Sequence, residues 1–406
     1  MTNARSNGRA YERSHPWINF SINLERASPK FWILLGEARS KCEHIAQVPL
    51  KPDTAQRLHQ LYLAKGVLAT TAIEGNTLSE GDVVKLLEGK LELPPSKQYL
   101  AKEINNIVGA CNWILNEIVR GATPRLSVEL IKNFNTRVLK GLKTDEEAVP
   151  GEIRTHSVGV ARYRAAPAED CEYLLMRTCE WLNSVVFEPA DNSLPEGDLA
   201  LPIIKAVLAH LYLAWIHPFA DGNGRSARLL EFLILVTSGL PSPAAHLLSN
   251  HYNQTRAEYY RYLDRASRAE DGVISFIEYA VTGLVDGLRS QLEVIRGQQL
   301  RVIWNDYIHE LFEDKNSRAD TRRLQLILDI SAQDAPISPA KVRELSPRTA
   351  AAYATKTPRT LSRDLRALHE MRLIEVSDEG LYANRALILS FLPVRGGTPI
   401  DDEEEE

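Results

Sequence analysis

The chain has 406 residues, of which 44% are hydrophobic and 25% charged, so it holds about three domain-sized units with sizeable cores. This composition is typical of globular proteins and excludes a disordered, collagenous or coiled-coil chain. The formal net charge is −5, but the last six residues are all acidic, and without their six negative charges it becomes +1. A near-neutral body argues against a polybasic membrane or non-specific nucleic-acid binder and leaves local basic patches open.

The cysteines and the apolar stretches indicate the compartment. Four cysteines lie outside any Cys-X-X-Cys pair, which argues against a disulfide scaffold and a zinc site and favours a reducing compartment. The first twenty residues are polar and contain no apolar run, so no secretory signal is expected. The most apolar stretch, 201–216, is interrupted by Lys205 and His210 and is too short to cross a bilayer. We therefore expect a cytoplasmic protein without a membrane partner.

Helical patterns follow one another through the first half of the chain. Apolar residues at three- and four-residue spacing predict a helix over 54–75 that ends at a Gly-Asn pair. Ser79, with Asp82 three residues later, predicts a capping box at the start of the next helix. Further helices are expected over 100–119 and 127–142.

The helical period fails once, between Pro150 and Pro167. Apolar residues that alternate around Gly159 predict a short hairpin or extended flap there. Helices then resume near Asp170 and continue, with breaks, to about Glu313. We expect a domain boundary in the polar stretch that follows.

Residues 216–228, between two apolar helices, bring five functional groups into one loop. Gly222 and Gly224 permit a tight turn that opens onto a helix N-terminus, where free N–H groups and the helix dipole favour an anion. Arg225 and Arg228, three residues apart, can add charge-assisted hydrogen bonds to phosphate oxygens. The pattern predicts a phosphate site.

Two further side chains suggest chemistry at that phosphate. Asp221 offers a hard oxygen ligand that suits Mg²⁺ bound to the same phosphates. His217 can act as the general base for a hydroxyl that attacks the phosphate, because imidazole titrates near neutrality. The alternative is a helix–loop–helix in which these side chains only cap helix ends.

The loop resembles the signature of the Fic family at every defining position: His, Pro, Phe, any residue, Asp, Gly, Asn, Gly, Arg, two of any kind, Arg. The resemblance extends over roughly residues 50–295 and includes Pro150–Arg154 at the start of the flap. It implies a mostly helical enzyme that transfers AMP from ATP to a Ser, Thr or Tyr hydroxyl of a protein, itself included, and releases pyrophosphate. ATP, Mg²⁺ and a target protein are the implied substrates and partners.

The resemblance also assigns a role to each matching position. His217 would deprotonate the hydroxyl, Asp221 would hold Mg²⁺, Phe219 would pack in the core, Gly222, Asn223 and Gly224 would form the anion hole, and Arg225 and Arg228 would hold the β- and γ-phosphates. In the flap, Val158, Gly159 and Val160 would pair with the target segment as an added strand. Family members that transfer a phosphate carry Lys where this chain has Gly224, so adenylyl transfer is preferred.

The segment Thr70–Asn76 resembles the family's inhibitory motif, in which Ser or Thr precedes a Glu followed by Gly or Asn. Within it, Glu74 would reach into the site and pair with Arg228, in place of the γ-phosphate of ATP. The alternative is that Glu74 is only a solvated charge before a helix cap. The first interpretation makes residues 54–75 an inhibitory helix and predicts low basal activity.

The C-terminal part shows three helices followed by a short strand pair, the order of a winged helix-turn-helix. In its third helix, the side chains that would reach DNA are Arg359, Thr360, Arg363 and Arg366. Residues 319–393 contain eleven Lys and Arg against nine Asp and Glu, a weak surplus for a dedicated DNA reader. Docking of a protein, including formation of a homodimer, is therefore an equal alternative.

Together these patterns predict a mainly α protein: a Fic-type helical core with a short β-hairpin flap, and a small C-terminal winged helix-turn-helix domain. The expected parts are an N-terminal helical region over 1–120, the Fic core over 121–295, a linker helix and polar boundary over 296–320, the winged-helix domain over 321–393 and a disordered acidic tail over 394–406. His210 is expected to be a packed helix residue, and Tyr259 and Tyr260 receive no assignment.

The predicted function is an autoinhibited protein adenylyltransferase. Two alternatives stay open. One is a transcriptional regulator that senses a nucleotide through the core and reads DNA through the C-terminal domain. The other is a hydrolase that removes AMP at the same site, with Glu74 positioning the water.

Overall fold

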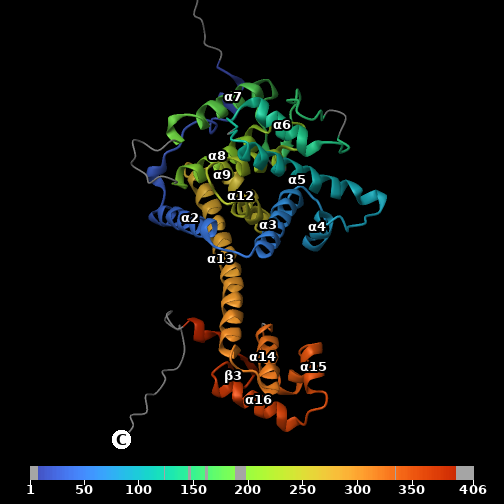
Figure 1. Cartoon of the computed structure of the whole chain (residues 1–406). Helices are drawn as coiled ribbons and strands as arrows, with labels where there is room; N and C mark the ends of the chain where they lie inside the picture. The colour runs from blue at the N-terminus through green and yellow to red at the C-terminus, as the bar shows by residue number, and fades with distance from the viewer. Residues whose placement is uncertain are drawn as a thin grey trace, which may run out of the picture. The chain divides into compact units, whose positions relative to one another are not determined.

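The computed structural model describes the chain except for short segments and the two ends (Figure 1). The described residues are 8–122, 124–144, 148–160, 163–187, 198–333 and 335–389. The predicted acidic tail at 394–406 lies outside them. Two compact units are present, residues 1–292 and residues 293–406.

The first unit is almost entirely helical, as predicted. Its helices are α1 (Ala10–Ser14), α2 (Pro29–Gln47), α3 (Pro52–Ala72), α4 (Glu80–Leu87), α5 (Gln98–Val119), α6 (Val128–Leu139), α7 (Cys171–Leu182), α8 (Ala200–Ile216), α9 (Asn223–Thr237), α10 (Ser242–Ala245), α11 (Leu247–Gln254), α12 (Arg256–Ala266) and the first part of α13 (Gly272–Phe312). Short 3-10 turns lie at Leu24–Arg26, Pro95–Lys97, Ala168–Asp170 and Val185–Phe187. Strands β1 (Gly159–Val160) and β2 (Tyr163–Arg164) form one antiparallel pair.

Helices α8 and α9 form the centre of this unit (Figure 1). Twelve of the 17 residues of α8 and 13 of the 15 residues of α9 are buried; α8 is apolar on nearly every side, whereas α9 also buries several polar side chains. The helices α5 and α6 pack against α9, α7 packs against α8, and α3 contacts α4, α5, α9, α10 and α11. The loop between α8 and α9 is therefore held from several directions.

Local sequence signals set most helix ends. Ser79 and Asp82 form the predicted capping box at the start of α4, and the side chain of Ser127 caps α6. Helix α3 ends at Ala72, three residues before the predicted end at residue 75, so Glu74 lies in the turn after the helix, just before Gly75 with φ +103°. Such a turn aims the Glu74 side chain away from the helix axis.

The second unit holds the rest of α13, then α14 (Arg318–Ser331), α15 (Pro347–Tyr353), α16 (Pro358–Glu370), β3 (Ile374–Ser377) and β4 (Gly380–Ala383), with 3-10 turns at Pro339–Glu344 and Arg385–Leu389. The two strands are antiparallel, and Ile337 forms a bridge to Leu381. This order of three helices and a hairpin is the order read from the sequence; the assignment to the winged helix-turn-helix class stays a prediction.

The division between the units differs from the boundary expected at 314–320. It follows Leu292, inside α13. The segment 296–320, expected as a linker, contributes Trp304, Ile308 and Phe312, which are buried in the core of the second unit. A helical segment whose apolar residues are fully buried belongs to the unit that buries them.

Candidate functional site

The loop between α8 and α9 begins with a backbone reversal at His217. This residue ends α8 with φ 48° and ψ 59°, a left-handed conformation that is uncommon for residues other than glycine. Its N–H still donates to the carbonyl of Leu213 at 2.9 Å. The reversal turns the imidazole out of the helix and toward the pocket described below.

Two asparagines hold the loop in shape. The side chain of Asn223 accepts from the N–H of Phe219 at 2.9 Å and donates to its carbonyl at 2.7 Å. The amide of Asn135, on α6, donates to the carbonyl of Asp221 at 2.8 Å and accepts from the N–H of Gly151 at 2.9 Å. The Asn223 side chain thus shapes the loop, which leaves its backbone N–H for the anion hole assigned to it from the sequence.

Arg154 ties the start of the flap to the same loop. Its side chain is buried, and its guanidinium donates to the carbonyls of His217 at 2.7 Å, His156 at 2.6 Å and Ala166 at 2.5 Å. The backbone N–H of Arg154 donates to the carbonyl of Pro218 at 2.9 Å. An arginine used in this way fixes backbone positions and takes no part in binding an anion.

Burial controls the protonation of His217. It lowers the pKa of the imidazole to about 4, although a hydrogen bond to the backbone of Ala214 and the nearby carboxylates of Glu74 and Asp221 act in the opposite direction. The ring is therefore neutral near pH 7. A neutral imidazole can accept a proton, which is what a general base must do.

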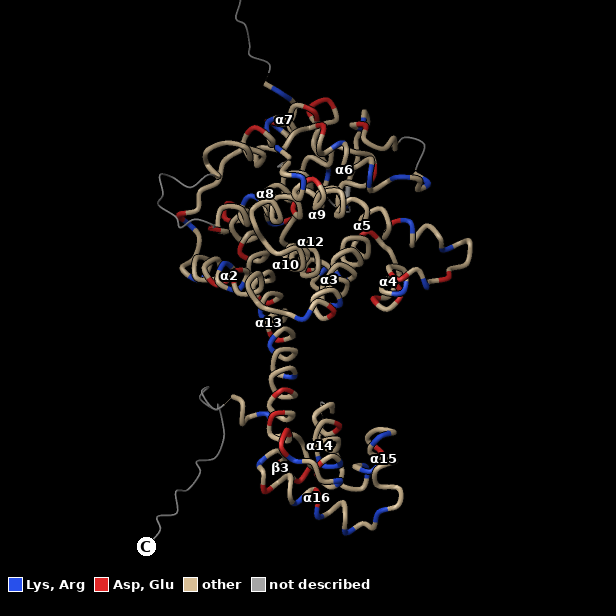
Figure 2. The backbone as a smooth tube through the Cα atoms, viewed as in Figure 1, with Lys and Arg blue, Asp and Glu red and all other residues tan. Residues whose placement is uncertain are grey.

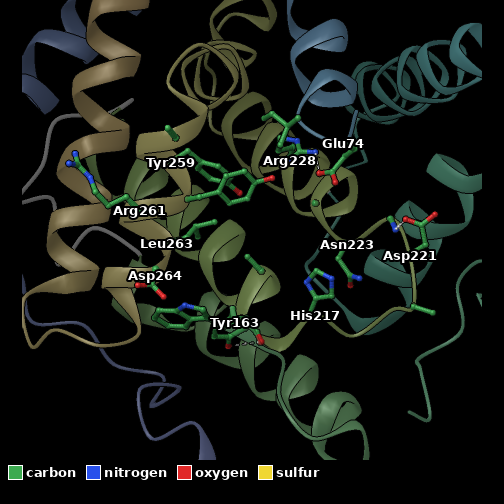
Figure 3. A pocket seen from close by; sticks show the side chains of 18 of the residues that line it. Glu74, Tyr163, His217, Asp221, Asn223, Arg228, Tyr259, Arg261, Leu263 and Asp264 are labelled. Carbon is green, nitrogen blue, oxygen red and sulfur yellow. Dashed lines mark hydrogen bonds and ion pairs between the residues drawn. The ribbon is translucent and has the colours of Figure 1, made fainter. Parts of the chain in front are cut away.

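Glu74 and Arg228 form a close ion pair in the same pocket (Figure 3). Nη2 of Arg228 donates to Oε1 of Glu74 at 2.5 Å and to the carbonyl of Thr70 at 2.8 Å. Burial alone would raise the pKa of Glu74, but Arg228 outweighs it, with Arg225 and His217 adding to the effect, so the pKa is lowered. The carboxylate is therefore charged at neutral pH.

Arg225 points elsewhere than the sequence suggested. Its guanidinium donates to Oδ1 of Asp221 at 2.9 Å and to Oε1 of Glu103, on α5, at 3.3 Å. The other oxygen of Glu103 accepts from the side chain of Asn76 at 2.8 Å. Arg225 does not line the pocket that Arg228 lines, so the two arginines do not share one phosphate-binding face in this structure.

A cavity of about 580 Å³, here named the motif pocket, joins these groups. Its volume lies in the range of pockets that bind small molecules. Figure 3 shows His217, Asn223 and the Arg228–Glu74 pair bordering one space, with α12 on its other side. The lining residues from α12 and the turn after it are Ala257, Tyr259, Tyr260, Arg261, Leu263, Asp264 and Arg268.

Sequence reasoning missed most of that α12 wall. The pair Tyr259–Tyr260 was the available signal, but nothing local told a pocket wall from a buried helix face. Asn135 and Glu103 were also missed, since each meets the loop only through tertiary contacts made more than eighty residues away along the chain.

Asp221 lies at the rim of the motif pocket with 47% of its side chain exposed. Within the described ranges, no group of three or more His, Cys, Asp and Glu side chains could hold a metal ion. A single exposed carboxylate fits a divalent cation that takes its other ligands from substrate phosphates and water.

The remaining predicted residues are not among those that line the pocket. In the flap, Gly159 pairs with Arg164 and the carbonyl of Val158 accepts from the N–H of Ala165 at 3.2 Å; the side chain of Val160 lies outside the described residues. In the second unit, three arginines of α16 are exposed and Thr360 is half-buried; the arginines are Arg359, Arg363 and Arg366. No helix of the described chain is long and apolar enough to cross a membrane.

Comparison with known proteins agrees with the signature in the loop. Residues 125–235 match the family model described as Fic/DOC family. Protein adenylyltransferase fic-1 from Caenorhabditis elegans is 35% identical over 205 residues, which are 50% of this chain and 36% of the relative. Protein adenylyltransferase Fic from Nematostella vectensis is 27% identical over 252 residues, or 61% and 54% of the two chains. This chain thus spans only about a third to a half of these relatives.

Solved structures show the same fold. A Fic family protein from Desulfovibrio desulfuricans superposes with a TM-score of 0.54 at 20% identity, covering 87% of this chain and 92% of its own. Fic-1 from C. elegans gives 0.52 at 25% identity, covering 66% and 73%. Residues 125–235, which include the loop at 217–228, are thus similar in sequence to the Fic/DOC family, and the chain resembles solved Fic proteins in its fold.

Proposed function

We propose that this chain is an autoinhibited protein adenylyltransferase, which transfers AMP from ATP to a Ser, Thr or Tyr hydroxyl of a protein and releases pyrophosphate. One observation carries the proposal: a neutral His217 and the buried Arg228 border one pocket, and Glu74 forms an ion pair with Arg228. The names of the relatives support the same chemistry. Four buried, unbridged cysteines are consistent with the expected cytoplasmic location.

The residues of the loop account for the steps. His217 takes the proton from the target hydroxyl, whose oxygen then bonds to the α-phosphorus while the bond from that phosphorus to the β-phosphate bridging oxygen breaks. Backbone N–H groups of residues 222–224, at the N-terminus of α9, stabilise the charge on the α-phosphate oxygens. Asp221 would hold Mg²⁺, which neutralises phosphate charge when bound.

Autoinhibition follows from competition for one guanidinium. Arg228 is 2% exposed, so it can serve either the Glu74 carboxylate or the γ-phosphate of ATP at a given time. The Glu74 carboxylate packs against Gly224, since a Cβ at that position would fall 2.1 Å from Oε1 of Glu74. A charged Glu74 therefore stands beside the part of the loop that the α-phosphate needs.

Labelled ATP tests the proposed reaction. The Glu74→Gly protein, incubated with Mg²⁺ and ATP, should retain label from the α-phosphate on protein and none from the γ-phosphate. The same preparation with His217→Ala should retain neither. Retention of γ-label would mean phosphoryl transfer and would overturn the proposal of adenylyl transfer.

Hydrolytic removal of AMP is a second candidate, favoured by the position of Glu74. Its carboxylate is charged, keeps 34% of its side chain exposed and lies close enough to His217 to affect the imidazole pKa. It could orient a water molecule toward an AMP–protein bond. In that case the wild-type protein, but not Glu74→Gly, would release AMP from a modified target.

The second unit is a candidate DNA-binding domain because three arginines of α16 are exposed while the acidic residue among them is buried. The acidic side chain of Asp364, on α16, is buried against Arg322 at 2.7 Å and Arg323 at 3.1 Å. The outer face of α16 keeps its exposed arginines, and Figure 2 shows Lys and Arg positions along α15, α16 and the turn between them. The exposed arginines of α16 support DNA as the partner.

The salt dependence of binding distinguishes DNA from a protein partner. Binding of a labelled DNA duplex should weaken with salt, and the double change Arg363→Ala and Arg366→Ala should reduce the slope by about two. No binding at low salt, together with a concentration-dependent mass, would instead favour docking of a second copy.

A further inference from the structure

Behind the motif pocket lies a buried polar cluster that the proposed reaction does not use. Its members come from four helices and are at most 3% exposed; they are His210 on α8, Glu231 on α9, Tyr252 on α11 and Tyr259 on α12. His210 was expected to be a packed helix residue. It is buried, but it is also the middle member of a polar chain.

The contacts run from the core to the pocket wall. Nε2 of His210 is hydrogen bonded to the hydroxyl of Tyr259 at 2.8 Å. Nδ1 of His210 faces Oε2 of Glu231 at 3.5 Å, and Oε1 of Glu231 accepts from the hydroxyl of Tyr252 at 2.9 Å. Tyr259 is the member of the cluster that lines the motif pocket.

A buried carboxylate is a costly way to fill a core. Glu231 is 1% exposed, and the groups that meet its oxygens are a tyrosine hydroxyl and an imidazole rather than a guanidinium or an ammonium group. An apolar side chain of similar size would stabilise the core at least as well. Networks of this kind are valuable because they specify one arrangement of the groups they bond.

In this protein the network fixes the position of one aromatic ring, that of Tyr259. The Tyr259 ring stacks on Tyr252 with centroids 4.9 Å apart and contacts Tyr260 at 5.2 Å. Burial raises the pKa of the Tyr259 hydroxyl, so the hydroxyl stays protonated near neutral pH. Glu231 follows Arg228 by three residues on α9, so the cluster and the arginine that lines the motif pocket are carried by the same buried helix.

We propose that Glu231 and His210 are positioning residues, which hold the Tyr259 ring as a fixed wall of the motif pocket and thereby set the affinity for the nucleotide. The inference rests on the proposed function only in that a nucleotide occupies this pocket. It adds a determinant of binding that lies outside the Fic signature, because neither His210 nor Glu231 is one of the signature's defining positions.

The test is nucleotide affinity in variants that keep the shape of each side chain. Binding of α,β-methylene-ATP with Mg²⁺, which cannot transfer AMP, is measured by calorimetry in the Glu74→Gly protein. Adding Tyr259→Phe or Glu231→Gln should raise the Kd by about three- to tenfold, the effect of losing one buried hydrogen bond. In transfer assays the KM for ATP should rise while kcat stays nearly constant.

Tyr279→Phe is the matched control, because Tyr279 is also buried, also bonds through its hydroxyl, to Thr255, and does not line the motif pocket. It should lower the melting temperature as much as Tyr259→Phe does without raising the Kd. If all these variants bind as the parent does and lose only stability, the cluster is structural and the inference is wrong. If the Glu74→Gly parent itself binds no nucleotide, the proposed function fails first and this inference fails with it.

Discussion

At the scale of single residues, burial converts an ordinary histidine into a base that is neutral throughout the physiological range. His217 owes its lowered pKa chiefly to burial at the end of an apolar helix, where the left-handed backbone turns it into the motif pocket. The signature identified the histidine, but its protonation depends on surroundings that no local pattern encodes.

The pH profile tests this environment. Since the active form is the neutral imidazole and its pKa is about 4, kcat/KM of Glu74→Gly should stay flat as the pH falls from 8 to about 5. The unfolded chain takes up this proton near pH 6.5, before the folded chain does, so the free energy of unfolding should decrease below that pH. A limb of kcat/KM centred near pH 6.5 would contradict the assigned environment.

Gly222 carries a second residue-scale prediction. It has φ +78°, and a Cβ there would lie 2.8 Å from Nδ2 of Asn135, which supports the loop. Gly222→Ala should therefore cost about 1–3 kcal/mol in unfolding free energy and abolish transfer. Gly239→Ala is the control, because its φ is +92° but nothing lies within 4 Å of its Cβ. Equal losses of activity in both variants would show that backbone strain, not the contact with Asn135, is decisive.

At the scale of elements, the turn after α3 is tied to α9 at two points. Glu74 meets Arg228 directly, while Asn76 reaches Arg225 through Glu103. The sequence predicted the first tie because the inhibitory segment and the signature are both local patterns. It did not predict the second, since Glu103 belongs to neither and meets them only in the folded protein.

The second tie has a measurable consequence. Glu103→Gln weakens the contact with Arg225 and the restraint on Asn76, so it should raise basal self-modification several-fold while Glu74 is intact. In the Glu74→Gly background it should add little, because the restraint it supports is already lost. A lower rate in both backgrounds would mean that Glu103 supports catalysis, by holding Arg225 on Asp221, rather than inhibition.

At the scale of the whole molecule, the sequence predicted the fold class, the motif loop and the order of elements. Capping residues such as Ser79 and Ser127 specify element ends locally, which is why those predictions held. The wall of the pocket on α12 and the place where the units divide depend on which apolar faces meet. Such contacts between distant segments cannot be predicted from any one stretch of sequence.

The division inside α13 yields a folding prediction. A fragment of residues 293–389 keeps Trp304, Ile308 and Phe312 and should unfold cooperatively, whereas a fragment starting at residue 321 lacks these three core side chains and should not. Trp304 is fully buried and donates from Nε1 to the hydroxyl of Ser331 at 2.6 Å, so its fluorescence reports unfolding of the longer fragment, and far-UV circular dichroism reports on both fragments. Cooperative unfolding of the shorter fragment would instead support the domain boundary that the sequence predicted at 314–320.

The most direct test of the central claim is the intact mass of four proteins after incubation with Mg²⁺ and ATP: wild type, Glu74→Gly, Glu74→Gly with His217→Ala, and Glu88→Gly, a control change at the C-cap of α4. The account predicts a gain of one AMP or more on Glu74→Gly, none when His217 is also replaced, and an equally small gain on wild type and Glu88→Gly. A wild-type gain equal to that of Glu74→Gly would contradict inhibition by Glu74, and a gain that survives loss of His217 would contradict its role as the base.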